Sequence, residues 1–357
     1  TQSTWGPHSM SAIKYIFHVS ALALILCKVG HSTIRTYQLK RGNFSLKLTN
    51  YGAIVMSVVL RDKNGVLGDI ALGFDSADQY KHDGTYFGAI VGRVANRIGR
   101  AQFHIGHTVY KLPANDGRNT LHGYADVIWR VKHHHPDSHI TFTYKSFDGE
   151  EGFPGSLSVS VTYMIVGTNK LAIKMAAKPL TKATPVNLAF HGYWNLKGHG
   201  SGSILGHKTQ IMGSEITPVD GELIPTGEIM NVTGSAYDFT EARDMGSRIG
   251  EVANGYDVNY VVEKVARGHL RKVATVWEEV SGRKMEVWSN QPGVQFYTGN
   301  MLRAMKGKGG AMYGKFGGFC LETQGFPDSV NHANFPSQIV HPNQVYHHFM
   351  LFRFTAY

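Results

Sequence analysis

Cysteine is almost missing from this sequence. Only two occur among its 357 residues, Cys27 and Cys320. This excludes the framework of several disulfides that stabilises many small secreted proteins, and it excludes a zinc site built from cysteines. The fold therefore depends on the packing of the chain itself.

Charged residues are also scarce, at 17% of the chain, whereas hydrophobic residues make up 42%. A chain of this composition can bury a substantial core, which excludes a disordered or fibrous protein. Glycine is frequent, with 41 residues, and aromatic residues reach 11%. This mixture favours many strands joined by tight turns and argues against a helical bundle.

The excess positive charge has no evident target. Lys and Arg number 36 and Asp and Glu number 26, which gives a net charge of +10. The densest basic stretch, Lys306–Lys315, is interleaved with glycine and lacks the aromatic spacing of a nucleic-acid-binding surface. We therefore predict a solvated loop at this stretch and no nucleic-acid partner.

Residues 10–32 are typical of a secretory signal, because Lys14 precedes the apolar run Tyr15–Cys27 and small residues follow it. A membrane anchor is the weaker alternative, since a spanning helix needs about 20 apolar residues. The apolar run also fits a strand or helix buried in the folded protein. We predict a secretory or extracellular location, with the cytoplasm as the alternative, and no membrane span after signal removal. Residues 1–9 are interpreted as a cloning remnant or a disordered extension.

Two N-x-S/T triplets, at Asn43 and Asn231, are compatible with glycosylation on the secretory route, although such triplets also arise by chance. Removal of the signal would take Cys27 with it. Cys320 would then remain as a single thiol, which we expect to be buried in an apolar strand.

Apolar and polar residues alternate repeatedly after residue 33, with the period of a half-buried strand. The clearest stretches are His139–Tyr144, Ser158–Tyr163, Ala172–Met175, Lys284–Trp288 and His348–Phe354. Turn-forming sequences occur at residues 62–65, 148–152 and 167–170. No repeat or linker divides the chain. We predict one all-β domain over residues 33–357, a large antiparallel β-sandwich.

Several polar clusters interrupt this pattern, and Glu322 is the most informative acid among them. It follows the apolar residues Phe319–Leu321 in a predicted strand, where a carboxylate is costly to bury without a partner or a proton. A partly buried carboxylate with a raised pKa suits proton abstraction, and a histidine across a cleft suits proton donation. His122 and His191 are the candidate histidines.

Each of these residues also has a purely structural interpretation. A single histidine among apolar residues is more often a hydrogen-bonded structural group, and a strand carboxylate often pairs with arginine. Arg97 fits an ion pair, and Asp257 fits a turn cap. His133–His135 cannot all face one ion from a strand, so we expect them at the surface. The sequence contains no P-loop, dinucleotide fingerprint or G-x-S-x-G motif, so nucleotide chemistry has no support.

Seven motifs occur in a fixed order over residues 38 to 355: Leu48–Ile54, Leu72–Asp75, Tyr86–Ile98, Ser146–Gly155, Leu223–Glu228, Tyr297–Asn300 and Glu322–His332. Each motif alone is a weak signal, but chance does not explain the presence of all seven in this order. The chain resembles the aldose 1-epimerase (galactose mutarotase) family. The resemblance implies a galactose mutarotase-like supersandwich with an open cleft, and interconversion of the anomers of free aldohexoses such as glucose and galactose without metal or organic cofactor.

The resemblance also implies roles for the charged residues. Glu322 would remove the proton of the anomeric hydroxyl, and His191 would protonate the ring oxygen. The ring then opens, the C1–C2 bond rotates by a half-turn, and reclosure with the roles reversed gives the other anomer. The implied partner is a small sugar or another hemiacetal, and a monomer is favoured although the sequence leaves the oligomeric state open.

Further residues would hold the sugar. The resemblance implies that His122 supports the ring oxygen or a nearby hydroxyl. It implies hydrogen bonds to the sugar hydroxyls from Asn96, Arg97, Asp257 and Gln295. Tyr193 and Trp194 would either face the sugar or pack in the core.

The sequence differs from the usual sequence of the family at three places beside these residues. Phe190 stands where an asparagine is usual, and Val258 stands where a histidine is common. After His122 the chain is shorter than usual and carries Tyr124. The exchange at Phe190 replaces an amide by an aromatic ring, which predicts a changed support for the neighbouring histidine or a more apolar pocket.

Two alternatives to mutarotation follow from these departures. One is an isomerase that opens and recloses the hemiacetal of a less polar metabolite. The other is a carbohydrate-binding protein with little turnover. The presence of both Glu322 and His191 argues against the second, because binding alone does not need an acid–base pair.

Overall fold

The structure is a computed structural model that describes residues 33–123, 125–262 and 269–357. The predicted signal at residues 10–32, the extension at residues 1–9 and Tyr124 lie outside the described residues, and the expectations for them stay predictions. Residues 34–357 form one compact unit. No helix in the described ranges is long and apolar enough to cross a membrane.

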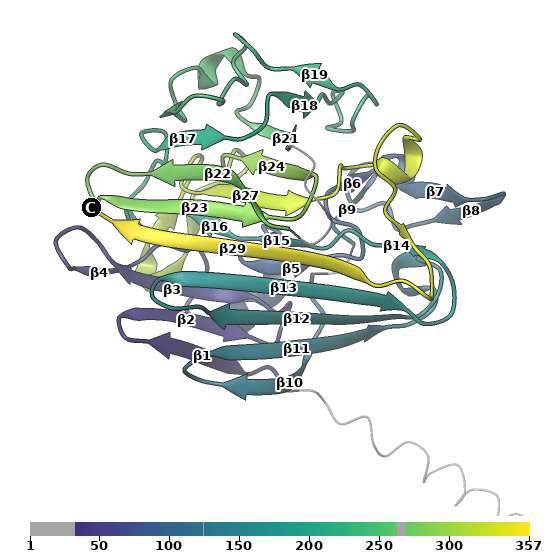
Figure 1. Ribbon diagram of the computed structural model, residues 1–357, viewed down its shortest axis with the longest axis horizontal. Coiled ribbons are helices and arrows are strands. Elements are labelled where there is room, and N and C mark those ends of the chain that lie inside the picture. The colour runs from purple at the N-terminus through teal and green to yellow at the C-terminus, as the bar shows by residue number, and fades with distance from the viewer. Residues whose placement is uncertain (1–32, 124, 263–268) are drawn as a thin grey trace, which may run out of the picture. The chain divides into compact units, whose positions relative to one another are not determined.

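The five alternating stretches become strands of one sheet (Figure 1). Among the described residues this sheet has nine strands, paired antiparallel throughout. Their order is β10 (Arg130–His135), β11 (His139–Ser146), β12 (Leu157–Ile165), β13 (Lys170–Pro179), β29 (Tyr346–Ala356), β23 (Arg283–Ser289), β22 (Arg271–Trp277), β17 (Lys208–Ile211) and β20 (Arg243–Asp244). The predicted strands lie within β11, β12, β13, β23 and β29, and the predicted turns at 148–152 and 167–170 join the first three.

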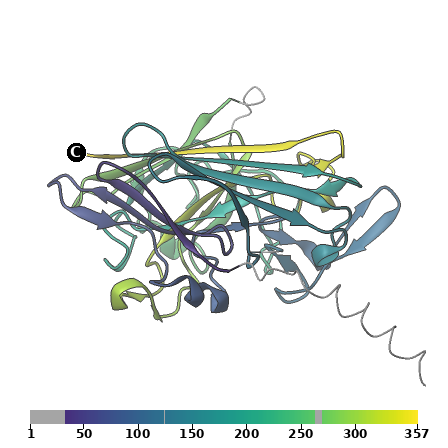
Figure 2. The ribbon, with the colours of Figure 1, turned by 90° about the horizontal axis from the view of Figure 1, so that it is seen from below.

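Two further sheets pack against it. The six-stranded sheet, counted in the described residues, has the order β16 (Tyr193–Trp194), β27 (Phe319–Gln324), β24 (Gly293–Tyr297), β21 (Asp257–Val261), β18 (Glu215–Thr217) and β19 (Met230–Asn231). The four-stranded sheet has the order β1 (Thr36–Arg41), β2 (Phe44–Thr49), β3 (Val55–Arg61) and β4 (Leu67–Asp69), with the third predicted turn, at 62–65, between β3 and β4. Figure 2 shows the purple strands of this sheet as a layer beneath the long strands of the nine-stranded sheet.

Short elements complete the described part of the chain. Five strand pairs lie outside these sheets: β14 (Thr184–Pro185) with β28 (Ile339–Val340), β15 (Ala189–His191) with β5 (Ala89–Val91), β6 (Arg97–Ile98) with β9 (Thr120–Leu121), β7 (Gln102–Ile105) with β8 (Thr108–Lys111), and β25 (Met305–Lys306) with β26 (Met312–Tyr313). The helices of the described ranges are short and of 3₁₀ type: η1 (Ala77–His82), η2 (Gly99–Ala101), η3 (Glu150–Gly152), η4 (Ile249–Glu251), η5 (Lys308–Gly310) and η6 (Ser329–Asn331).

One continuous hydrophobic core joins the three sheets. Phe44 of β2 meets Phe354 of β29 with ring centroids 5.8 Å apart, and Trp194 of β16 meets Phe352 of β29 at 5.4 Å. The alternation of each strand sends every second side chain into this core, as the burial of β12 shows. Each fully buried aliphatic or aromatic side chain stabilises the fold by about 1.5–3 kcal/mol. The sandwich predicted from the sequence is confirmed.

The expectation of a solvated loop at Lys306–Lys315 is wrong in part. This stretch forms β25, η5 and β26, and Lys308 is buried, with its Nζ 2.6 Å from Asp69 Oδ2 and 2.9 Å from the carbonyl oxygen of Met56. Burial lowers the pKa of Lys308, and Asp69 opposes that shift. Gly307 is needed here for close packing, because a Cβ at this position would collide with the ring of Tyr313.

A buried arginine fastens the loop before β6 to the rest of the unit. Arg93 is fully buried, and its guanidinium donates to Ser146 Oγ and to the carbonyl oxygens of Phe147, Pro154 and Gly155. These acceptors lie at the end of β11 and in the turn between β11 and β12. The arginine therefore replaces water for a whole turn of backbone and holds that turn against the loop.

We expect Arg93→Met to lower the free energy of unfolding by about 3–5 kcal/mol, because several buried carbonyl oxygens lose a charged donor at once. Urea denaturation followed by circular dichroism measures it. The exposed Arg130 on β10 supplies the control, since Arg130→Met should change stability by less than about 0.5 kcal/mol. Equal stability of the two variants would contradict the clamp.

Candidate active site

The register of the six-stranded sheet places three polar residues side by side. Glu322 of β27 lies opposite Gln295 of β24, which lies opposite Asn259 of β21. Directly paired residues in antiparallel strands point to the same face of the sheet. The three side chains therefore form a row that crosses the sheet, and each is buried.

A second row lies beside the first, on the same face. Cys320 pairs with Tyr297, and Tyr297 pairs with Asp257. The intervening residues, which include Leu321, Phe296 and Val258, point to the opposite face and belong to the hydrophobic core. The sheet thus has one polar face and one core face.

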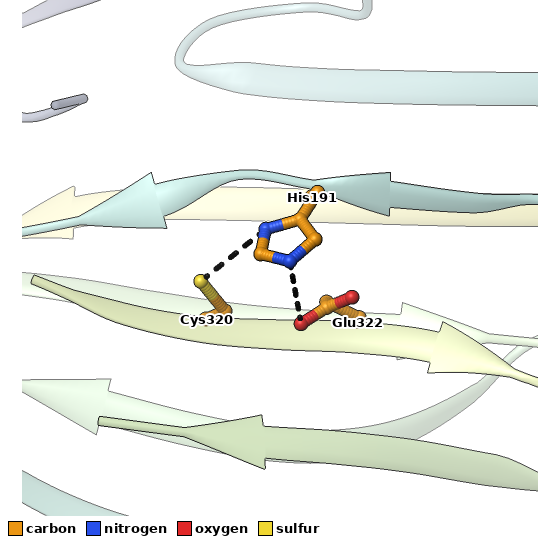
Figure 3. A group of neighbouring side chains, drawn as sticks. All are labelled: His191, Cys320 and Glu322. Carbon is orange, nitrogen blue, oxygen red and sulfur yellow. Dashed lines mark hydrogen bonds and ion pairs between the residues drawn. The ribbon is translucent and has the colours of Figure 1, made fainter. Parts of the chain in front are cut away.

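His191 reaches this polar face from the neighbouring short strands. Tyr193 of β16 pairs with Cys320, and His191 lies two residues earlier, so strand alternation turns both side chains the same way. Figure 3 shows the imidazole over β27. Its Nε2 lies 3.7 Å from Glu322 Oε1, and its Nδ1 lies 3.8 Å from Cys320 Sγ.

Aromatic rings surround the imidazole of His191. Tyr193 stacks on it with centroids 5.1 Å apart and planes 20° apart, and His122 meets it edge-on at 5.1 Å. Tyr86 contacts both histidine rings, at 4.7 Å from His122 and 5.8 Å from His191. These contacts fix the plane of the His191 ring.

Asn96, Arg97 and His122 come from the β6–β9 pair and the loops beside it. The backbones of Asn96 and His122 both have positive φ, 64° and 61°, and they are joined by a hydrogen bond from His122 N to Asn96 O. His122 Nδ1 accepts from Asn96 N at 3.1 Å, so the neutral ring carries its proton on Nε2. Arg97 Nε donates to Asp116 Oδ2 at 2.7 Å. The mutual hydrogen bonds hold two strained residues in place.

All seven residues expected from the sequence line one cavity of about 180 Å³. They are Asn96, Arg97, His122, His191, Asp257, Gln295 and Glu322. Tyr193 also lines the cavity, whereas Trp194 packs in the core, as alternation along β16 requires. The structure therefore brings together groups that are as much as 226 residues apart in the sequence (322 − 96).

Sequence reasoning missed several lining residues. Tyr86 and Tyr297 are each the first residue of one of the seven motifs, and their place in these motifs is the sequence signal that could have identified them. Leu121, Met301 and Leu302 also line the cavity, and apolar residues in short loops or at strand ends give no chemical signal in a sequence.

Burial governs the protonation of the acid and the base. It raises the pKa of Glu322 well above the ordinary value, and the nearby charge of Asp257 adds to this while Arg97 opposes it. Burial also lowers the pKa of His191 to about 4 and that of His122 well below its usual range. The pair of Glu322 and His191 therefore favours a protonated carboxyl beside a neutral imidazole.

Glu322 and His191, together with Cys320, could also hold a metal ion. In the described ranges, His191, Cys320 and Glu322 form a group whose potential metal ligands all lie within 4.8 Å of one another. Burial raises the pKa of the Cys320 thiol well above its ordinary value, however, and metals bind the thiolate. An ion that bound here would therefore have to displace the proton of the thiol.

Comparison with known proteins shows the family of this chain. The family model described as aldose 1-epimerase matches residues 35–353. The chain belongs to the aldose 1-epimerase family. It is therefore an epimerase of the isomerase class, a mutarotase.

Relatives of this aldose 1-epimerase cover nearly its whole length. The galactose mutarotase of Bos taurus is 40% identical over 92% of this chain and 96% of its own. The aldose 1-epimerase of Escherichia coli K12 is 30% identical, over 87% and 91%. Among solved structures, the GalM/aldose epimerase homologue from C. elegans superposes with a TM-score of 0.85, at 27% identity over 91% of this chain and 99% of that one.

Two departures of this aldose 1-epimerase from the usual family text lie outside the cavity. Phe190 points into the core, where its ring meets Tyr163, Trp194 and Phe352. Val258 lies on the core face of β21. The expectation that Phe190 makes the pocket more apolar is therefore wrong, because alternation along β15 directs only its neighbour to the cavity. The third departure, at Tyr124, lies outside the described residues.

We expect Phe190→Asn to act on stability and leave sugar binding intact. The free energy of unfolding should fall by about 3–5 kcal/mol, since a core ring is lost and an amide is buried, while KM should stay within about twofold. Phe147→Asn, at an exposed ring, is the control and should be nearly neutral. A changed KM at unchanged stability would place Phe190 in the pocket instead.

Proposed function

We propose that this aldose 1-epimerase interconverts the α and β anomers of free aldohexoses, galactose and glucose among them, with Glu322 and His191 as the proton-transfer pair. One observation carries the proposal: a carboxyl and an imidazole, both buried, lie 3.7 Å apart and line the same cavity. Two groups that exchange protons with one small molecule must both lie within hydrogen-bond reach of it.

The reaction begins with an ionised Glu322 and a protonated His191. The carboxylate takes the proton of the anomeric hydroxyl, and the C1–O1 bond becomes a carbonyl. The C1–O5 bond breaks at the same time, and O5 takes the proton of His191. The open-chain aldehyde now lies beside a protonated Glu322 and a neutral His191. After a half-turn about C1–C2, both protons return and the ring recloses on the other face of the carbonyl.

The electrostatics of the cavity support this scheme. A protonated carboxyl beside a neutral imidazole is the state that burial favours, and it is also the state that accompanies the open-chain aldehyde. The site thus favours the protonation state of the ring-opened intermediate. Arg97 works in the other direction, lowering the pKa of Glu322, and so keeps the ionised form within reach.

The remaining walls of the cavity suit a polyhydroxylated, neutral molecule. His122 offers an Nε2–H donor, Arg97 offers guanidinium N–H groups, and the bonded pair of Asp257 and Gln295 offers both an acceptor and a donor. The hypothesis of a less polar substrate loses two of its three supports, because Phe190 and Val258 face the core. Galactose is the sugar in the names of relatives 40% identical to this chain, which supports it as a substrate.

The protein should accelerate the mutarotation of fresh α-D-galactose and α-D-glucose, as followed by polarimetry. We expect Glu322→Gln to lower kcat by at least about 10²-fold, since acid–base catalysis contributes 10²–10⁴-fold per group. The control is Glu278→Gln, at a buried carboxylate in the turn between β22 and β23 that does not line the cavity; it should retain full activity.

Three outcomes separate the hypotheses. Equal rates with protein and with buffer alone would contradict the proposal for these sugars. Sugar binding without acceleration would favour a binding protein with little turnover. Full activity of folded Glu322→Gln would refute the role given to Glu322.

The pH profile of kcat/KM reports the proton shared by the pair. In the active form, Glu322 and His191 together hold one exchangeable proton. Activity should therefore fall below about pH 4, where His191 becomes protonated while Glu322 is still protonated and the pair holds two. Activity should also fall at high pH, above the raised pKa of Glu322, where the pair loses its only proton. Polarimetry corrected for the buffer rate measures both limbs. An acid limb near the ordinary histidine value of about 6.5 would contradict a buried, neutral His191.

A further inference from the structure

Gln324 lies next to the catalytic row without lining the cavity. It follows Glu322 by two residues on β27, points to the same face of the sheet and is fully buried. Its Nε2 donates to Gln295 Oε1 at 3.3 Å and to Asn259 Oδ1 at 3.4 Å. One amide thus contacts both of the other strands that form this face.

These contacts determine which way the Gln295 amide points. Its Oε1 accepts from Gln324, and its Nε2 donates to Asp257 Oδ1 at 2.7 Å. If the amide turned over, its oxygen would face a carboxylate and its NH₂ group would face another NH₂ group. Gln324 and Asp257 together therefore allow one orientation.

Gln324 destabilises the fold in a way that an apolar side chain of the same size would not. The Oε1 atom of Gln324 is buried and has no hydrogen-bond partner in the described part of the chain, which is destabilising. A Cβ at Gly293, opposite Gln324, would collide with Asn259 Oδ1 and displace that side chain. An apolar side chain at 324 would avoid the unpaired acceptor, so the amide has another purpose.

We propose that Gln324 is a positioning residue that sets how the cavity recognises a sugar hydroxyl. By holding the Gln295 amide in one orientation, it presents an N–H donor beside the carboxylate of Asp257. That pair suits a hydroxyl that donates to the carboxylate and accepts from the amide, so sugars with a hydroxyl at this position are preferred to the corresponding deoxy sugars. The inference rests on the proposed function, since it assigns specificity to the same site.

The test is Gln324→Met, which keeps the length of the side chain and removes its donor. We expect KM for the hydroxylated sugar to rise about 3- to 10-fold with kcat within about twofold, because the interaction holds substrate and transition state alike. In a series of singly deoxygenated sugars, the wild-type protein should bind one member more weakly, and the variant should lose that preference.

Gln338→Met is the matched control. Gln338 is also buried, and its Oε1 also has no hydrogen-bond partner among the described residues, but its Nε2 donates to the backbone carbonyl oxygen of Phe326 and it lines a different cavity. It should leave KM unchanged. The double variant Gln295→Met/Gln324→Met should match Gln295→Met alone, because Gln324 acts through Gln295. Additive effects, or a fall in kcat with KM unchanged, would overturn the proposal.

Two measurements keep the test decisive if activity or folding fails. The side-chain amide resonances of Gln295 in ¹⁵N-glutamine-labelled protein should shift in Gln324→Met without any sugar present, and unshifted resonances would overturn the inference even if the wild-type protein proves inactive. If Gln324→Met does not fold, Gln324→Leu replaces it. Its side chain has no donor, so KM should rise again, and an unchanged KM would overturn the inference.

Discussion

The register of β27 against β24 and β21 is the constraint on which the site depends. The pairing that sets Leu321 against Phe296 in the core also sets Glu322 against Gln295 at the cavity. A slip of one residue would bring Leu321 to the cavity and force the carboxyl into the core, where an unpaired charge is very costly. Hydrophobic packing on one face of the sheet therefore aligns the polar groups on the other.

Burial decides the chemistry of that polar face. Withdrawal from water shifts the pKa values of Glu322 and His191 in opposite directions, and both shifts favour the uncharged form. The charge of Arg97 limits the first shift, and Arg97 is itself paired with Asp116. A small number of charges, placed by strands far apart in the sequence, thus determines where one proton resides.

The sequence predicts the fold well and the site in part, for physical reasons. Alternation is a local property, so strands such as β12 and β29 could be found from it. Glu322 and the histidines stand out because polar groups among apolar residues are costly. Which face a residue occupies depends on the pairing of strands, however, and this is why Phe190 was expected near the cavity and Gln324 was overlooked. The burial of Lys308 in η5 has no local signal either, because its partner Asp69 lies on β4, far away in the sequence.

The aromatic rings around His191 bear on which nitrogen of its imidazole can transfer a proton to the sugar. Tyr193, His122 and Tyr86 all contact the imidazole and hold its plane. One ring nitrogen, Nε2, faces Glu322, so in the proposed reaction the same nitrogen must give the proton away and take it back. In that reaction, the half-turn that changes one anomer into the other takes place in the substrate, about its C1–C2 bond.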